Sequence, residues 1–348
     1  MKQTTTSICD EHIIYLENGT KMYGKSPPES NFYICCNNPN GAYWYAGQNI
    51  LYTIDAELAT LHDCVRCIIF RRDSNSCFSD FFSFVSEAGM SSDWNCSAEA
   101  FQRIISNSEN RIPNLYEEMY VSDVQQIISA VQNLLIGVET SFIDYYRLIS
   151  EINVQGFSES KTYICGGIPA VRVTTALGNY FTQIYSILDL LTKIEYEIEN
   201  KHETFETYRR LKSNSILYGQ KDELRINDRQ GSLFVKDEFI AMIESIRNEI
   251  VHNGSWEAIP KVFVQLENNK PVGRFVYFPD MPNGRYARYK NRHHFFSEEK
   301  QVNQVLPEIT MEFYKRLFIT ILYMKNPELT PEMADIIFQT EKSRWECN

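Results

Sequence analysis

The stretch that decides the fold is residues 234–254, FVKDEFIAMIESIRNEIVHNG. Its apolar residues recur at intervals of four, three and four, which predicts an amphipathic helix. They are Phe239, Ile243, Ile246 and Ile250. Asn253-Gly254 marks the end of this helix, because both residues tolerate the left-handed conformation found at helix C-termini. We therefore expect a helix over residues 234–253, with Arg247, Asn248 and His252 in its last two turns.

The spacing of these three polar residues limits how they can act together. At about 100° per residue, Asn248 and His252 lie about 40° apart, whereas Arg247 lies about 140° from His252. Arg247 and His252 can therefore meet at one ligand in two ways. Either the last turn is distorted, or a second copy of the helix completes the cleft, which predicts a symmetric dimer.

A simpler interpretation of the same residues stays open. Basic residues near a helix C-terminus are favoured by the helix dipole alone. The chain also repeats the Arg-to-His spacing at Arg288 and His293, where no apolar helix surrounds it. Spacing by itself therefore does not identify a site, but the amide after Arg247 and the helical setting favour one.

The pattern Arg247-Asn248-x-x-x-His252 resembles the signature of the HEPN superfamily. The resemblance implies an α-helical, usually dimeric domain of a kind that recurs in toxins, abortive-infection proteins and CRISPR effectors, and many such domains are metal-independent endoribonucleases. The motif covers six to eight residues, and its helical context extends over about 169–324. One departure is Gly254, where HEPN proteins paired with nucleotidyltransferases often carry a tyrosine.

The resemblance implies catalytic roles for the three motif residues. An imidazole titrates near neutral pH, so His252 suits proton transfer. Arg247 suits the non-bridging phosphate oxygens, and Asn248 would orient His252 or the scissile phosphate. We expect a 2′,3′-cyclic phosphate and a 5′-hydroxyl as products, with no metal and no cofactor.

Residues 283–296, NGRYARYKNRHHFF, are the strongly basic part of the chain and a candidate RNA-contacting segment. Cations can hold phosphates while aromatic rings stack on unpaired bases. The candidate contacts are Arg285, Tyr286, Arg288, Tyr289, Lys290 and Arg292. The equally open alternative is an edge strand whose aromatic residues pack inward and whose basic residues keep the edge soluble.

The composition restricts the classes of function. The chain has 348 residues, 43% hydrophobic and 13% aromatic, as expected of a globular protein. Its formal net charge of −11 opposes indiscriminate nucleic-acid binding, so an RNA site must be a local positive patch. Nine cysteines, a polar N-terminus and no run of about 18 apolar residues favour a reduced, cytoplasmic protein without a membrane span. Cys64 and Cys67 have metal-ligand spacing, but we expect buried thiols there.

We expect a mainly α fold: a HEPN-like helical bundle with an additional N-terminal helical region and a small inserted β-hairpin. The predicted parts are an irregular or β-prone segment over 1–45, a helical region over 46–160, and a HEPN-like domain over 161–348 with the hairpin at about 260–279. The second strand of this hairpin is expected over 275–278, and residues 156–167 are expected to be a connection. A short helix is expected around 78–89. The carboxylates of Glu195, Glu197 and Glu199 are interpreted as a solvated helix face. Residues 214–232 are predicted to form a polar loop.

The leading functional hypothesis is a dimeric endoribonuclease whose partners are RNA, a second copy of the chain and an antitoxin or regulatory protein. Its setting by resemblance would be a toxin or a phage-defence effector. The first alternative is a non-catalytic HEPN-like module that binds nucleotide, RNA or protein. The second is an interaction scaffold whose first 155 residues form the docking surface.

Overall fold

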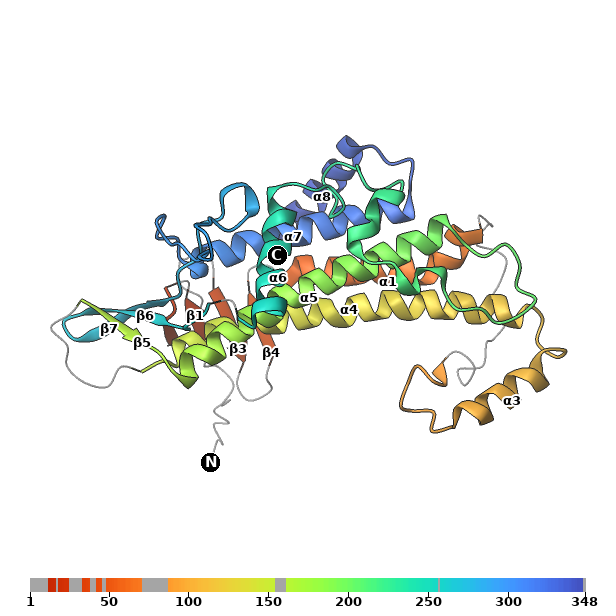
Figure 1. Cartoon of the computed structure of the whole chain (residues 1–348), viewed down its shortest axis with the longest axis horizontal. Coiled ribbons are helices and arrows are strands. Elements are labelled where there is room, and N and C mark those ends of the chain that lie inside the picture. The colour runs from red at the N-terminus through yellow and green to blue at the C-terminus, as the bar shows by residue number, and fades with distance from the viewer. Residues whose placement is uncertain are drawn as a thin grey trace, which may run out of the picture.

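Figure 1 shows the fold as a computed structural model, which describes residues 12–16, 18–24, 33–37, 42–45, 48–70, 87–153, 161–255 and 257–346. The chain is 60% helical and 9% strand, so the predicted mainly helical class is confirmed. The short helix expected around 78–89 falls largely outside the described residues.

Most of the described chain is built from seven α-helices. Their bounds are α1 Gln48–Phe70, α3 Ala98–Ser108, α4 Leu115–Ser150, α5 Ile168–Glu199, α6 Glu238–Asn253, α7 Val302–Lys325 and α8 Pro331–Glu346. Short 3-10 turns cover Lys212–Ser215, Tyr218–Glu223 and Pro282–Gly284. Helices α1, α4, α5 and α7 run along the long axis, with the β-structure at one end and α3 near the other (Figure 1).

The core lies between these long helices. Helices α4, α5 and α7 carry fully buried aromatic rings on their inner sides, including Phe142 and Tyr146 of α4 and Tyr180 and Phe181 of α5. The Tyr180 hydroxyl is satisfied by Thr310 of α7 at 2.8 Å, so burying this ring leaves no orphaned polar atom. Burial of a large side chain contributes about 1.5–3 kcal/mol, which makes this aromatic layer the main source of stability.

Helix α4 also meets the length and hydropathy criteria of a membrane span, which the sequence analysis did not anticipate. Its most apolar 18-residue window has a mean hydropathy of 1.2 and is 39% buried inside the protein. Core helices of soluble proteins pass the same test, and α4 packs against α1 and α5 here.

Two small antiparallel sheets lie at one end of the helices. The first has the order β2-β1-β3-β4, with β1 His12–Leu16, β2 Lys21–Gly24, β3 Tyr33–Asn37 and β4 Ala42–Tyr45. The second has the order β5-β6-β7, with β5 Thr162–Cys165, β6 Val262–Glu267 and β7 Lys270–Phe275.

The hairpin predicted at about 260–279 corresponds to β6 and β7, but its second strand was predicted too late. Asn268 and Asn269 adopt positive φ angles of 50° and 62° and reverse the chain, so pairing begins at Lys270 rather than Phe275. Tyr277 instead forms an isolated bridge to Gln301. Strand β5 was expected to be a connection and adds a third strand to the hairpin.

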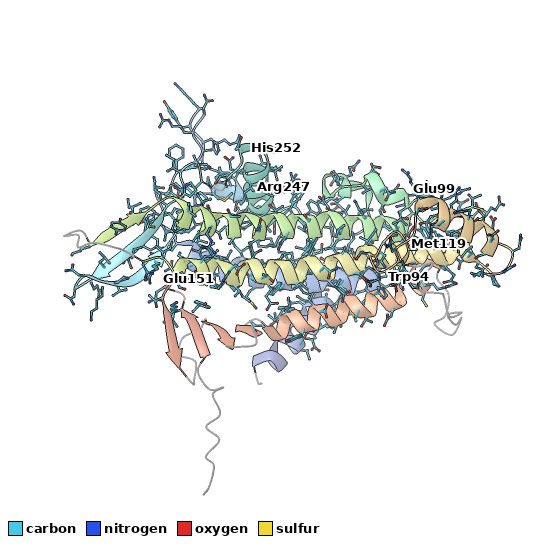
Figure 2. The ribbon with its side chains drawn as sticks, turned by 90° about the horizontal axis from the view of Figure 1, so that it is seen from below. Trp94, Glu99, Met119, Glu151, Arg247 and His252 are labelled. Atoms are coloured by element: carbon cyan, nitrogen blue, oxygen red, sulfur yellow. The ribbon has the colours of Figure 1, made fainter. Side chains whose placement is uncertain are left out.

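Helix α6 begins four residues later than expected, because the Asp237 side chain accepts a hydrogen bond from the Ile240 amide at 3.2 Å and caps it there. It ends at Gly254, whose φ is 83° and whose amide donates to the Ile250 carbonyl. Ile243 and Ile246 are fully buried, and α6 packs on α5. Helix α5 lies between α6 and α4 (Figure 2).

Candidate functional site

A depression of about 530 Å³ lies between α6 and the segment 285–288. Helix α6 contributes Asn248 and His252, which are both exposed. The segment contributes Arg285 and Arg288 from almost forty residues further along the chain. The structure therefore brings two of the three motif residues together with two of the basic residues selected from sequence.

Arg247 does not line this depression. Its guanidinium lies over the ring of Tyr185 on α5, 4.6 Å from the ring centroid. Its Nη1 donates a hydrogen bond to Asn248 Oδ1 at 3.0 Å, so it reaches the depression only through that amide. Figure 2 shows Arg247 and His252 on α6, each at its own position along the helix.

The last turn of α6 is regular as far as Asn253. Of the two ways in which Arg247 and His252 could meet, the distorted turn is therefore excluded. Convergence on one ligand then requires a second chain, or a movement of Arg247 away from Tyr185.

Residues 280–297 fold around the Asp280 carboxylate. This carboxylate accepts hydrogen bonds from the Ser297 amide at 2.8 Å, the Ser297 hydroxyl at 2.6 Å and the Glu298 amide at 3.1 Å. Burial opposes ionisation, but the hydrogen bonds from Ser297 and Glu298 lower the pKa of Asp280 below its usual value. Asp280 thus holds the two ends of the basic segment together.

Gly284 allows this segment to pack closely against α6. Its φ is +70°, and a Cβ at this position would lie 2.1 Å from the Glu238 carbonyl oxygen of α6. The Ser245 hydroxyl donates to the Gly284 carbonyl at 3.2 Å from the same helix. Only glycine combines this conformation with such a close approach.

The basic segment divides into exposed and buried residues. Arg285, Arg288, Lys290 and Arg292 are exposed, and so is Tyr289, whose side chain is 63% accessible. Tyr286 is only 5% accessible, so its selection as a base-stacking residue was wrong. Its ring packs against His293 and His294, because the turn around Gly284 directs it toward α6.

Three site residues were missed from sequence: Glu249, His293 and His294. His293 Nε2 lies 2.6 Å and His294 Nε2 lies 3.4 Å from the same oxygen, Glu249 Oε1. Asn253 donates to the other oxygen of Glu249 at 2.9 Å. The adjacent histidines were visible in the sequence, but nothing in it placed them against a carboxylate 44 residues away.

Burial and neighbouring charge oppose each other in this cluster. Burial alone would raise the pKa of Glu249, but the hydrogen bonds from His293 and Asn253 lower it below its usual value. Burial, together with the neighbouring His293, lowers the pKa of His294. Near neutral pH the cluster therefore contains an ionised carboxylate and an uncharged His294.

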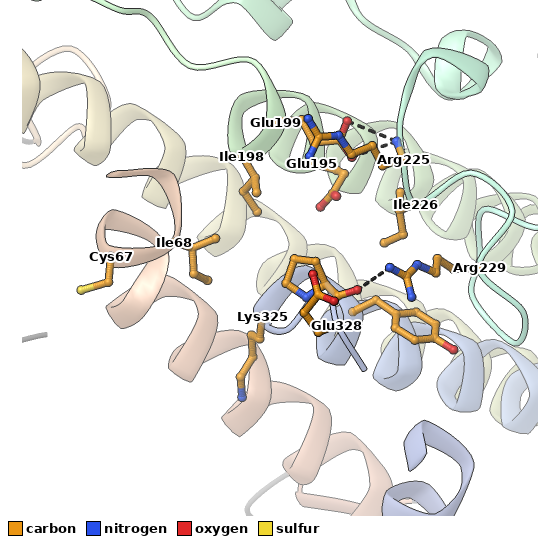
Figure 3. A pocket seen from close by; sticks show the side chains of 12 residues that line it. Cys67, Ile68, Glu195, Ile198, Glu199, Arg225, Ile226, Arg229, Lys325 and Glu328 are labelled. Atoms are coloured by element: carbon orange, nitrogen blue, oxygen red, sulfur yellow. Dashed lines mark hydrogen bonds between the residues drawn. The ribbon is translucent and has the colours of Figure 1, made fainter. Parts of the chain in front are cut away.

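A second cavity, of about 370 Å³, lies between α1, α5 and the end of α7 (Figure 3). The Glu195 carboxyl points into it, and Arg225 and Arg229 of the predicted polar loop line its wall. The interpretation of the α5 carboxylates as solvated was wrong for two of the three: Glu195 is 5% accessible and Glu197 is fully buried.

Long-range partners explain the burial of these carboxylates. Glu197 accepts hydrogen bonds from the Tyr120 hydroxyl at 2.8 Å and the Ser213 amide at 2.6 Å. Burial, with the nearby Glu199 carboxylate, raises the pKa of Glu195 well above its usual value.

Cys64 and Cys67 lie on α1 as half-buried free thiols. Burial raises the pKa of Cys64. Within the described part of the chain, the cluster of Glu249, His293 and His294 is the one group of three metal-binding side chains in mutual reach, so the cysteine pair lacks a third ligand.

Comparison with known proteins gives no relative: no family model, no curated protein and no solved structure matches this chain.

The close approach at Gly284 leads to the first prediction. Gly284→Ala should displace the basic segment from α6 and lower the melting temperature by at least about 2 °C, because both the backbone conformation and the Glu238 carbonyl oppose a Cβ. Gly219→Ala is the matched control, since a Cβ there meets nothing within 4 Å. Equal melting temperatures for the two variants, measured by calorimetry, would contradict the seating role of Gly284.

Proposed function

We propose that this protein is a metal-independent endoribonuclease of HEPN type that acts as a dimer. The observation that carries the proposal is the depression in which Asn248 and His252 face Arg285 and Arg288. An imidazole, an amide and two guanidinium groups are the functional groups that metal-free cleavage of a phosphodiester needs.

The roles follow from position. His252 is exposed at the mouth of the depression and would transfer the proton of the attacking 2′-hydroxyl or of the leaving 5′-oxygen. Arg285 and Arg288 would hold the phosphates on either side of the scissile bond. Tyr289, the exposed ring of the same segment, is available to stack on an unpaired base. Arg247 positions the Asn248 amide through the hydrogen bond between their side chains.

The charge distribution supports an RNA ligand. The protein has a formal net charge of −11, yet the depression is bordered by Arg285 and Arg288 and carries Glu244 and Glu249 as its carboxylates. Glu249 lies 2.6 Å from His293 Nε2. The depression thus carries two guanidinium groups beside its two carboxylates, and this local concentration of cations on an acidic body favours one binding site over indiscriminate binding.

A dimer would bring Arg247 of one chain toward His252 of the other. Exposed apolar side chains surround the ends of α5 and α6 near His252: Ile168 is 78%, Val171 47%, Val251 49% and Ile259 69% accessible. We take these side chains as the candidate dimer interface, since exposed apolar surface is found at protein interfaces. A two-fold axis beside it would place two copies of α6 across one cleft.

The biological setting that the family resemblance suggests is a toxin or phage-defence effector restrained by an antitoxin or regulatory protein. The rest of the proposal is independent of that setting.

The central prediction concerns His252. Wild-type protein should cleave mixed cellular RNA in excess EDTA and leave 5′-hydroxyl ends, and His252→Ala should lower the rate about 100-fold or more, because proton transfer is lost. The measurement is 5′-end mapping of the fragments with purified dimers. His202→Ala, which alters a histidine on a different surface, is the control and should cleave like wild type.

Cleavage by His252→Ala at the wild-type rate would refute the site. RNA binding without cleavage by a folded dimer would refute catalysis and favour the binding-module alternative instead.

The composite cleft predicts complementation between two inactive variants. Arg247→Ala and His252→Ala, mixed and allowed to exchange subunits, should recover about a quarter of the wild-type rate, because half of the dimers are mixed and each mixed dimer has one complete site. No recovery in verified mixed dimers would mean that each site is built within one chain.

The apolar surface near His252 gives the third prediction for this function. Ile168→Glu should convert the dimer to monomers and abolish cleavage, because a carboxylate in an apolar contact is strongly unfavourable. Ile336→Glu on α8 is the matched control, since Ile336 is 64% accessible on a different surface. Sedimentation measures the oligomeric state, and an unchanged dimer of Ile168→Glu would place the interface elsewhere.

A further inference from the structure

Two imidazoles and a carboxylate converge at the wall of the depression. One ring nitrogen of His293, one ring nitrogen of His294 and one carboxylate oxygen of Glu249 all lie within 4.8 Å of one another. Glu249 is buried on α6, whereas the two histidines belong to the basic segment. We propose that these three side chains form a binding site for a divalent transition-metal ion, with zinc as the favoured ion.

The distances between these ligand atoms suit a metal ion with small adjustments. Bonds of about 2.0–2.1 Å at tetrahedral angles place two ligand atoms roughly 3.3–3.4 Å apart. His294 Nε2 already lies 3.4 Å from Glu249 Oε1. His293 Nε2 lies 2.6 Å from the same oxygen and donates a hydrogen bond to it. To ligate a metal ion, this nitrogen would release its proton to solvent or carry it on Nδ1 instead, and the two atoms would move apart by about 0.8 Å.

Two buried polar atoms support the proposal that a metal ion binds at this position. Within the described residues, the buried Tyr286 hydroxyl has no hydrogen-bond partner, and the buried His294 Nε2 makes no well-aligned hydrogen bond, although it lies 3.4 Å from Glu249 Oε1. Buried polar groups of native proteins are nearly always satisfied. Tyr286 is 5% accessible, and its ring packs against both imidazoles, 5.6 Å from the ring of His294 and 5.9 Å from that of His293.

A metal ion would satisfy both atoms. It would take the lone pair of His294 directly, and a water molecule on its fourth position could accept the Tyr286 hydroxyl. Asn253 would then act from outside the coordination shell, because it already donates to the second oxygen of Glu249 at 2.9 Å. Such outer hydrogen bonds orient ligating carboxylates in known metal sites.

The donor set selects the class of ion. Two imidazoles and one carboxylate are a donor set found around zinc, whereas Mg²⁺ and Ca²⁺ prefer oxygen ligands. The site would also link α6 to the basic segment, because it joins Glu249 to two residues of that segment. The inference rests on this geometry and does not depend on the ribonuclease proposal.

The experiment is zinc titration of the metal-stripped, full-length protein, monitored by competition with a chromophoric chelator and by thermal unfolding. Wild type should bind one zinc ion per chain and gain thermal stability, because a ligand bound only by the folded state stabilises it. Mg²⁺ should do neither. His294→Gln should lose stoichiometric binding and the thermal gain, and Tyr286→Phe should bind roughly tenfold more weakly.

Cys64→Ala is the matched control for zinc binding elsewhere, since Cys64 and Cys67 have ligand spacing on α1. It should bind zinc like wild type. Loss of binding in Cys64→Ala but not in His294→Gln would overturn the proposal, and so would the absence of zinc binding by folded wild type. If His294→Gln does not fold, Glu249→Gln replaces it, because the amide keeps the volume of the carboxylate while weakening the ligand.

RNA cleavage distinguishes the two proposals. Cleavage in EDTA with normal zinc binding supports both. Zinc binding without any cleavage leaves the metal site intact and refutes the ribonuclease. Cleavage that requires zinc supports the site and refutes the metal-independent mechanism.

Discussion

The burial of α5 between α4 and α6 is the constraint on which the rest of the structure depends. Fully buried Tyr180, Phe181 and Ile184 occupy a single turn of α5, and residues this large stabilise the fold only when neighbouring helices cover them. α4 covers one side and α6 another. Because Ile243 and Ile246 must face α5, the rotation of α6 about its own axis is fixed. That rotation leaves Asn248 and His252 exposed and directs Arg247 onto Tyr185.

The second part of the site is positioned by backbone contacts rather than by apolar packing. The β6–β7 hairpin returns the chain toward the helices, and Asp280 then closes the loop that carries the basic residues. Gly284 brings this loop to within contact distance of α6. A segment with many exposed charges cannot be held by an apolar core, so its position relies on these few polar and steric contacts. The site is therefore sensitive to single changes far from His252.

Sequence reasoning succeeded where the information was local. The period of α6, its end at Asn253-Gly254 and the presence of a hairpin near 260–279 all follow from neighbouring residues. It failed where a distant partner decides the outcome. The sequence predicts a solvated Glu197 carboxylate, but in the fold it is buried and accepts hydrogen bonds from Tyr120 and Ser213. The sequence predicts an exposed Tyr286 ring in a basic segment, but the turn at Gly284 buries this ring. The family resemblance itself stays a prediction, since no known protein matches the chain.

Glu249 connects the two proposals, because it lies between Asn248 and His252 in sequence yet faces away from solvent. A rotation of about 100° per residue separates its side chain from that of Asn248, so one turn of α6 can serve two purposes. Its exposed positions would contact RNA, and its buried carboxylate would hold a metal ion with His293 and His294. Arg285 and Arg288 lie between Gly284 and His293, the two points at which the segment is attached to α6. A metal ion at Glu249 would therefore fix the residues proposed to contact phosphate without taking part in the proposed reaction.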